Sequence, residues 1–265
     1  MPILRIGIQT LSLRRPLRKA LEAAGRLGAD GVEIDLRTEL PTADLSQTAI
    51  RQFRKLLEDH RLGVAAVAFP LRRGLADPAD LDRRVAAVMA AMTAAAQLGA
   101  RVLVAPIGSI PEADEDPTAR GGLIESLTAV GAHGDRVGTR LAIAAGAAGP
   151  AEVAALLADL PEGVVGADLH PARLLHHGHD LAEAINALGD AVLHVHAADA
   201  VRDLAAGGGV VDVPIGRGSV DFPELLAALD ARDYRGWLTI ERPAATDPEQ
   251  ELGDAVAYLR ELGRG

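Results

Sequence analysis

Short apolar runs alternate with longer amphipathic stretches along the chain. The apolar runs are bounded by Gly, Pro or Asp, a pattern that is typical of buried strands. The stretches between them carry apolar residues three and four positions apart, such as Leu17, Leu21 and Ala24, which is typical of helices that pack on one face. The pattern predicts eight strands, at 5–10, 31–36, 63–69, 101–106, 140–145, 163–170, 191–197 and 237–242. It predicts helices at 16–27, 48–60, 80–98, 122–138, 150–160, 181–188 and 222–231.

Strict alternation of strands and helices predicts an α/β fold, namely a closed (β/α)8 TIM barrel formed by a single domain over residues 1–265. Gly28 and Gly99 follow two predicted helices, at the position where a left-handed residue commonly ends a helix. An open doubly wound sheet is the alternative, but the first strand and turn, IGIQTLSL, lack the G-x-G-x-x-G phosphate loop of that fold. Long loops are expected at 108–122 and 203–218, both after strands, at the barrel end where catalytic groups gather.

Composition excludes several classes of function. The chain has 27 basic and 37 acidic residues, a net charge of −10, which argues against nucleic acid as a partner. It has no cysteine, so disulfides, a thiolate nucleophile and cysteine metal ligands are excluded. No apolar run approaches the roughly 18 residues that span a bilayer, and the N-terminus lacks an export signal. We therefore expect a soluble cytoplasmic protein without a membrane partner.

Imidazoles and carboxylates gather at the ends of the last three predicted strands. Asp168 and His170 end the sixth strand, His194 and His196 end the seventh, and Glu241 ends the eighth. Side chains two apart on a strand share a face, so each pair points the same way. Neighbouring strand ends would unite them in a polar pocket that suits a divalent metal or acid/base chemistry. A single strand histidine is, however, commonly a core residue with satisfied hydrogen bonds, and the presence of metal stays open at this point.

Two further carboxylates, Glu33 and Asp35, end the second predicted strand. Glu33 has two alternative placements. It either points into the same pocket, or lies at the opposite end of the barrel, paired with Arg5.

Four segments resemble the xylose isomerase-like family of sugar isomerases and epimerases, a superfamily that is also similar to endonuclease IV. They are LRKALEAAGRLGADGVEID (17–35), HVHAAD (194–199), VPIGRGSVDFPELLAAL (213–229) and YRGWLTIE (234–241). The resemblance implies a TIM barrel with a divalent metal held by four strand ends. In the family these are a Glu on strand five, an Asp on strand six, a His on strand seven and a Glu on strand eight.

The match at these positions is partial. Glu241 and His196 correspond to the strand-eight and strand-seven ligands, and Arg202 resembles an arginine that contacts substrate in ketose epimerases. Ala144 stands where strand five should carry its Glu, and His170 stands at the strand-six Asp position, in DLHP. The resemblance therefore implies a rewritten metal set of His170, His196 and Glu241, which binds Mn, Mg, Zn or Co, or a site that has lost its metal.

Epimerisation beside a carbonyl needs one group to remove a carbon-bound proton and another to return one. The resemblance makes Glu241 the base and Arg202 a substrate contact, and the strand-end positions add Asp168 as a second catalytic carboxylate and His194 as a substrate-binding residue. Whether the protein is an enzyme depends on how far the loss at Ala144 is compensated.

Three hypotheses follow from this partial match. The first is an isomerase or epimerase of a sugar, polyol or keto acid. The second is a lyase or hydrolase of a modified sugar, and the third is a non-catalytic barrel that binds a small polar ligand. The Ala-rich stretch at 85–96 packs either on the barrel or in a homo-oligomer.

Overall fold

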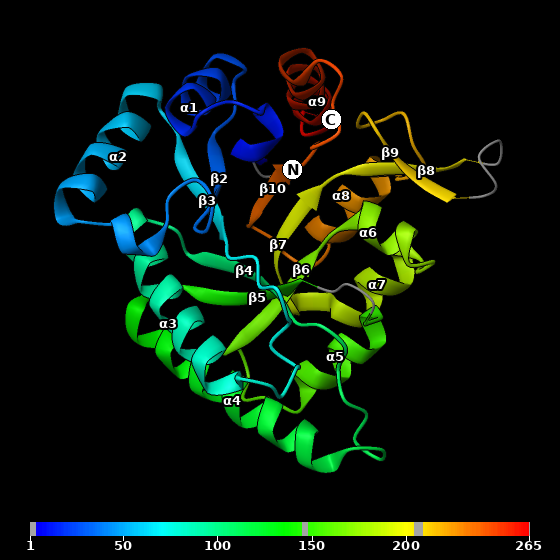
Figure 1. Ribbon diagram of the computed structural model, residues 1–265. Helices are drawn as coiled ribbons and strands as arrows, with labels where there is room; N and C mark the ends of the chain where they lie inside the picture. The colour runs from blue at the N-terminus through cyan, green and yellow to red at the C-terminus, as the bar shows by residue number, and fades with distance from the viewer. Residues whose placement is uncertain (1–3, 145–147, 204–208, 265) are drawn as a thin grey trace.

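Eight parallel strands close into a barrel, with helices packed around it (Figure 1). The computed structural model describes residues 4–144, 148–203 and 209–264. Around the barrel the strands follow the order β1-β10-β7-β6-β5-β4-β3-β2, so the first and last barrel strands of the chain pair with each other. This confirms the predicted TIM barrel. The barrel strands are β1 Arg5–Gln9, β2 Gly31–Asp35, β3 Gly63–Ala68, β4 Val102–Pro106, β5 Arg140–Ala144, β6 Val165–Leu169, β7 Val192–Ala197 and β10 Trp237–Ile240.

The helices cover the outside of the barrel with their apolar faces. Gly28 and Gly99 have φ of 82° and 95°, which confirms that left-handed glycines follow the first and third helices. One helix begins earlier than predicted, because the Asp116 side chain accepts a hydrogen bond from the Ala119 backbone N–H and caps it. The helices are α1 Leu17–Arg26, α2 Gln47–His60, α3 Leu81–Leu98, α4 Pro117–Val137, α5 Pro150–Ala158, α6 Pro171–His176, α7 Leu181–Leu188, α8 Phe222–Asp230 and α9 Pro248–Leu262, with short 3-10 turns at Thr10–Leu13, Thr42–Asp44 and Gly189–Ala191.

An antiparallel hairpin follows β7 and projects beyond the barrel (Figure 1). It consists of β8 Asp199–Asp203 and β9 Gly209–Val213. The expected long loop over 203–218 is therefore wrong for 209–213, and its residues 204–208 lie outside the described part of the chain. The buried Asp199 carboxylate accepts hydrogen bonds from the backbone N–H groups of Ala200, Gly216, Gly218 and Val220. These bonds tie the returning chain to the hairpin base.

Two apolar layers hold the barrel together. The larger one lies between strands and helices and includes Ile6, Ile34 and Leu103, all fully buried. A smaller cluster of Ala66, Val104, Ala142 and Ala144 belongs to β3, β4 and β5. Among the described residues, no helix is long and apolar enough to cross a membrane.

Candidate metal and acid/base site

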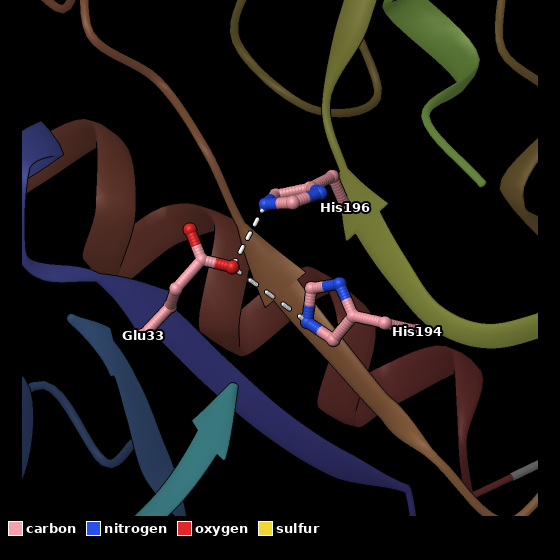
Figure 2. A group of neighbouring side chains, drawn as sticks. All are labelled: Glu33, His194 and His196. Carbon is pink, nitrogen blue, oxygen red and sulfur yellow. Dashed lines mark ion pairs between the residues drawn. The ribbon is translucent and has the colours of Figure 1, made fainter. Parts of the chain in front are cut away.

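Five acidic and imidazole side chains meet at the carboxyl ends of four barrel strands. Glu33 comes from β2, Asp168 from β6, His194 and His196 from β7, and Glu241 follows β10. Strand register sets their heights, since Asp168 pairs with His194 and Thr239 of β10 pairs with His196. Figure 2 shows the two imidazoles of β7 turned toward the Glu33 carboxylate across the barrel. The predicted gathering of polar groups at these strand ends is thus observed.

Asp168 holds both imidazoles of β7. Its Oδ1 lies 2.8 Å from His194 Nδ1 and 2.9 Å from His196 Nδ1, and its side chain is fully buried. A buried carboxylate only accepts, so both rings donate through Nδ1 and turn Nε2 toward the barrel axis. His194 Nε2 then accepts from the Thr239 hydroxyl at 2.7 Å. Carboxylates that orient histidines in this way are typical partners of metal-binding imidazoles.

His196 and Glu33 form a close, buried ion pair whose angles are not those of a hydrogen bond. His196 Nε2 lies 2.9 Å from Glu33 Oε2, yet both atoms are buried without a hydrogen-bond partner among the described residues. His194 Nε2 is 3.9 Å from the same oxygen (Figure 2). Two ligands bound about 2.1 Å from one ion at a right angle are about 3.0 Å apart, so this spacing suits a shared ion. Glu33, His194 and His196 could therefore hold a metal, which would take the His194 Nε2 lone pair from the Thr239 hydroxyl.

His170 and Glu241 form a second pair beside these residues. The imidazole of His170 caps α6, because its Nδ1 accepts from the Arg173 backbone N–H at 3.3 Å, and its Nε2 donates to Glu241 Oε2 at 2.9 Å. Glu241 Oε2 is also 3.8 Å from His196 Nε2, and the rings of His170 and His196 stack at 5.1 Å. The structure thus brings together the predicted ligand set of His170, His196 and Glu241. In this arrangement His170 has its proton on Nε2, which favours a donor over a ligand.

Opposite charges keep the carboxylates of the site ionised. Burial raises the pKa of Asp168, but the two imidazoles outweigh it and hold that pKa well below its usual range. The pKa of Glu33 is lowered in the same sense by His196 and His194, and that of Glu241 by His170 and His196. Burial lowers the pKa of His196, but Asp168 and Glu33 reverse this and raise it well above its usual value. The pKa of His170 is lowered, chiefly by burial, so this ring is neutral.

A cavity of about 290 Å³ opens beside the site. Glu33 and His196 line it, together with Arg173, whose side chain is 44% exposed and whose Nη2 lies 3.7 Å from Glu241 Oε1. The opposite wall is apolar and consists of Ala68, Phe69, Val104, Ala105, Pro106 and Ala144. The cavity therefore has one polar and one apolar side and the size of a small-molecule site.

Several residues predicted for the site do not line this cavity, and His170 and Glu241 are among them. His194 and Asp168 are buried beneath it, and neither contributes to its lining. Arg202 is exposed on β8, where it pairs with Val210, and it does not line the cavity either. All three keep their predicted roles as hypotheses, but Asp168 and His194 lie beneath the cavity lining, where they reach a substrate only through a bound ion or a neighbouring side chain.

The structure settles the placement of Glu33, which the sequence left open, and adds Arg173, which the sequence did not indicate. The alternative pairing of Glu33 with Arg5 is wrong, because the Arg5 guanidinium stacks over Trp237 at 4.9 Å. A carboxylate at the end of a barrel strand was the available signal for Glu33. No sequence pattern indicated Arg173, because its position near Glu241 depends on the turn at His170 where α6 begins.

A sequence profile shows the family, and the structural comparisons show the same fold. The profile described as "Xylose isomerase-like TIM barrel" matches residues 21–262. A xylose isomerase domain protein from Planctomyces limnophilus superposes with a TM-score of 0.85 at 21% identity, over 98% of both chains. A xylose isomerase-like TIM barrel protein from Mycobacterium smegmatis, in complex with magnesium, gives 0.78 at 18% identity, over 98% of this chain and 96% of the other.

A D-allulose 3-epimerase from Methylomonas sp., in complex with D-allulose, gives a TM-score of 0.76 at 19% identity, over 97% of this chain and 96% of the other. No curated protein matches the sequence significantly. The structural neighbours are below 25% identical, so they support the fold, and the profile covers nearly the whole chain. The chain belongs to the xylose isomerase-like TIM-barrel family.

Proposed function

We propose that the protein transfers a proton at a carbon next to a carbonyl group, in a small sugar or sugar-like substrate bound in the cavity beside Glu33 and His196. The observation that carries this proposal is the buried ion pair of His196 Nε2 and Glu33 Oε2, two atoms without a hydrogen-bond partner among the described residues. A second carboxylate, that of Glu241, lies 3.8 Å from His196 Nε2. Similarity to sugar epimerases, one of them bound to D-allulose, supports a sugar-like ligand.

Glu33, His194 and His196 are the residues that would hold a divalent ion, Mg, Mn, Zn or Co. Two imidazoles and a carboxylate suit such ions, and Asp168 orients both rings from below. The magnesium complex of the Mycobacterium smegmatis relative is consistent with this choice. When bound, the ion would polarise the substrate carbonyl and stabilise the negative charge that develops on its oxygen.

Glu241 is the proposed base. Its carboxylate is ionised and only 14% exposed, and it is held by the Nε2 proton of His170. Glu241 does not itself line the cavity, but it lies next to His196 and Arg173, which do. An ionised, oriented carboxylate in that position can accept a carbon-bound proton. Arg173, which lines the cavity next to Glu241, is placed to bind a substrate oxygen, and Asp168 acts by positioning the imidazoles.

Ala144 favours a second candidate reaction. It lines the cavity from β5, where the family resemblance implies a glutamate, so the apolar wall offers no second proton carrier. A single base next to a carbonyl suffices for elimination of a leaving group from a modified sugar. A lyase is therefore the alternative to an epimerase on the same site.

Metal content is the first test. We expect the protein purified without chelators to carry about one divalent ion per chain, measured by plasma mass spectrometry. Glu33→Gln and His196→Gln should lose this ion, whereas His176→Gln, which changes an exposed histidine outside the site, should keep it. Metal-free wild-type protein that also fails to bind Mn²⁺ in titration would refute the metal assignment.

Proton transfer is tested separately. We expect the protein in D₂O to incorporate deuterium into D-allulose or a related ketose, followed by proton NMR. Glu241→Gln should abolish the exchange, although this variant keeps the fold and the Glu33 carboxylate. An unsaturated product in place of an epimer would select the lyase. If a panel of ketoses and keto acids undergoes neither exchange nor elimination, the result favours a binding protein.

A further inference from the structure

A second cavity lies at the amino-terminal end of the barrel, on the face opposite to the proposed active site. Its volume is about 400 Å³. It is formed where β4, β5, β7 and β10 begin, by residues such as Arg101, Arg140, Val192 and Gly236. In TIM barrels this end is ordinarily a structural face, so a formed cavity there needs its own explanation.

The cavity is rich in arginine. Four arginines line it, namely Arg101, Arg140, Arg232 and Arg235, against two aspartates, Asp190 and Asp233. Asp233 is neutralised by Arg235, whose Nη2 lies 2.7 Å from its carboxylate. The lining therefore has a net positive charge in a protein whose net charge is −10. A locally positive cavity in a negatively charged protein attracts anions to that cavity.

Three of these guanidinium groups have no carboxylate partner within 4.0 Å in the part of the chain that the structure describes. Arg101 and Arg140 are neighbours, because the Arg140 backbone N–H donates to the Arg101 carbonyl at 2.8 Å. Arg140 Nε is buried and makes no hydrogen bond to any described residue. Arg232 bonds only to neutral oxygens, those of Asn186 and Ala228. Desolvation lowers the pKa of Arg140, and the charge of Asp135 opposes this only in part.

We propose that this amino-terminal cavity binds a small phosphate monoester. Guanidinium groups match the tetrahedral oxygens of phosphate through paired N–H donors, and Arg101 and Arg140 can offer such donors from adjacent strands. The remaining wall includes Val102, Leu193 and Leu229, which provide an apolar surface for the organic part of the ligand. The site is separate from the proposed catalytic residues, and the inference does not depend on the proposed reaction.

Calorimetric titration of the full chain with glycerol 3-phosphate tests the proposal. We expect binding to the wild type, about tenfold weaker binding to Arg101→Gln and to Arg140→Gln, and a larger loss in the double variant. Arg54→Gln removes the same charge from an exposed position on α2 and should bind like the wild type. Arg101 is exposed, so its substitution leaves the fold intact and keeps the test valid if Arg140→Gln unfolds.

Further ligands and one further variant separate the alternatives. Inorganic phosphate should bind more weakly than the ester, and glycerol should not bind. Arg173→Gln, at the opposite end of the barrel, should retain full affinity for glycerol 3-phosphate. The proposal is overturned by equal affinity for inorganic phosphate and the ester, by no effect of Arg101→Gln and Arg140→Gln, or by a loss confined to Arg173→Gln.

Discussion

The barrel interior is divided into two unequal arcs. On β3, β4 and β5 the inner cluster consists of Ala66, Val104, Ala142 and Ala144, all small and apolar. On the arc from β2 through β1, β10 and β7 to β6, polar groups take that place, with Glu33, Asp168, His194, His196 and Thr239 buried there. Small side chains leave room, and the cavity lies against them. The polar arc carries the carboxylates and imidazoles, and the small side chains of the apolar arc leave room for a substrate. The reacting groups would therefore contact a substrate from one side.

The largest effect is expected from removing the centre of the polar arc. Asp168→Asn should lower the free energy of unfolding by about 3 to 5 kcal/mol, because it removes one of the two buried carboxylates that stabilise the His196 imidazolium. Urea unfolding measures this loss. The control, Asp159→Asn, removes a partly exposed partner of Arg120 and should cost less than about 1 kcal/mol. Equal losses of unfolding free energy in the two variants would show that charge interactions within the polar arc do not stabilise the fold.

Metal affinity should rise with pH. Asp168 and Glu33 raise the pKa of His196 well above 6.5, so in metal-free protein this ring carries a proton on both nitrogens at neutral pH. A bound ion replaces the Nε2 proton, so the apparent affinity should increase up to about tenfold per pH unit below that pKa and level off above it. Competition with a chromophoric chelator, corrected for its own protonation, measures this. A flat profile between about pH 6 and pH 8 would mean that His196 is not a ligand.

A carboxylate introduced into the apolar arc should sharpen the comparison. Ala144→Glu places an acid beside the cavity on β5, and we expect about tenfold tighter Mn²⁺ binding. Ala144→Gln has nearly the same shape without the charge and should bind Mn²⁺ like the wild type. Equal affinities for Ala144→Glu and Ala144→Gln would place the ion out of reach of β5.

The smallest effect on stability is expected at the rim. Arg173→Gln should change the free energy of unfolding by less than about 1 kcal/mol, because its side chain is 44% exposed and 3.7 Å from Glu241. If Arg173 binds the substrate, the KM of this variant should rise while its free energy of unfolding is almost unchanged. A stability loss comparable to that of Asp168→Asn would instead make Arg173 part of the supporting network.

Much of the fold could be predicted from local patterns. Strand and helix periodicity indicated the eight barrel strands with ends within two residues of those observed, and Gly28 and Gly99 marked helix ends. The hairpin of β8 and β9 could not be read in this way, because it depends on Asp199 accepting four backbone N–H groups from residues up to 21 positions away. Helix α6 is short, and its capping by His170 leaves no periodic signal.

By itself the sequence determined which groups are available: a barrel without cysteine, with histidines and carboxylates at its strand ends and alanine at position 144. Only the tertiary structure decided their partners. Closure of the barrel brings Glu33, early in the chain, within 2.9 Å of His196, and it sets His170 as a donor to Glu241. The reason is physical: periodicity fixes which way a side chain points, whereas distances across a barrel depend on how all its strands are staggered.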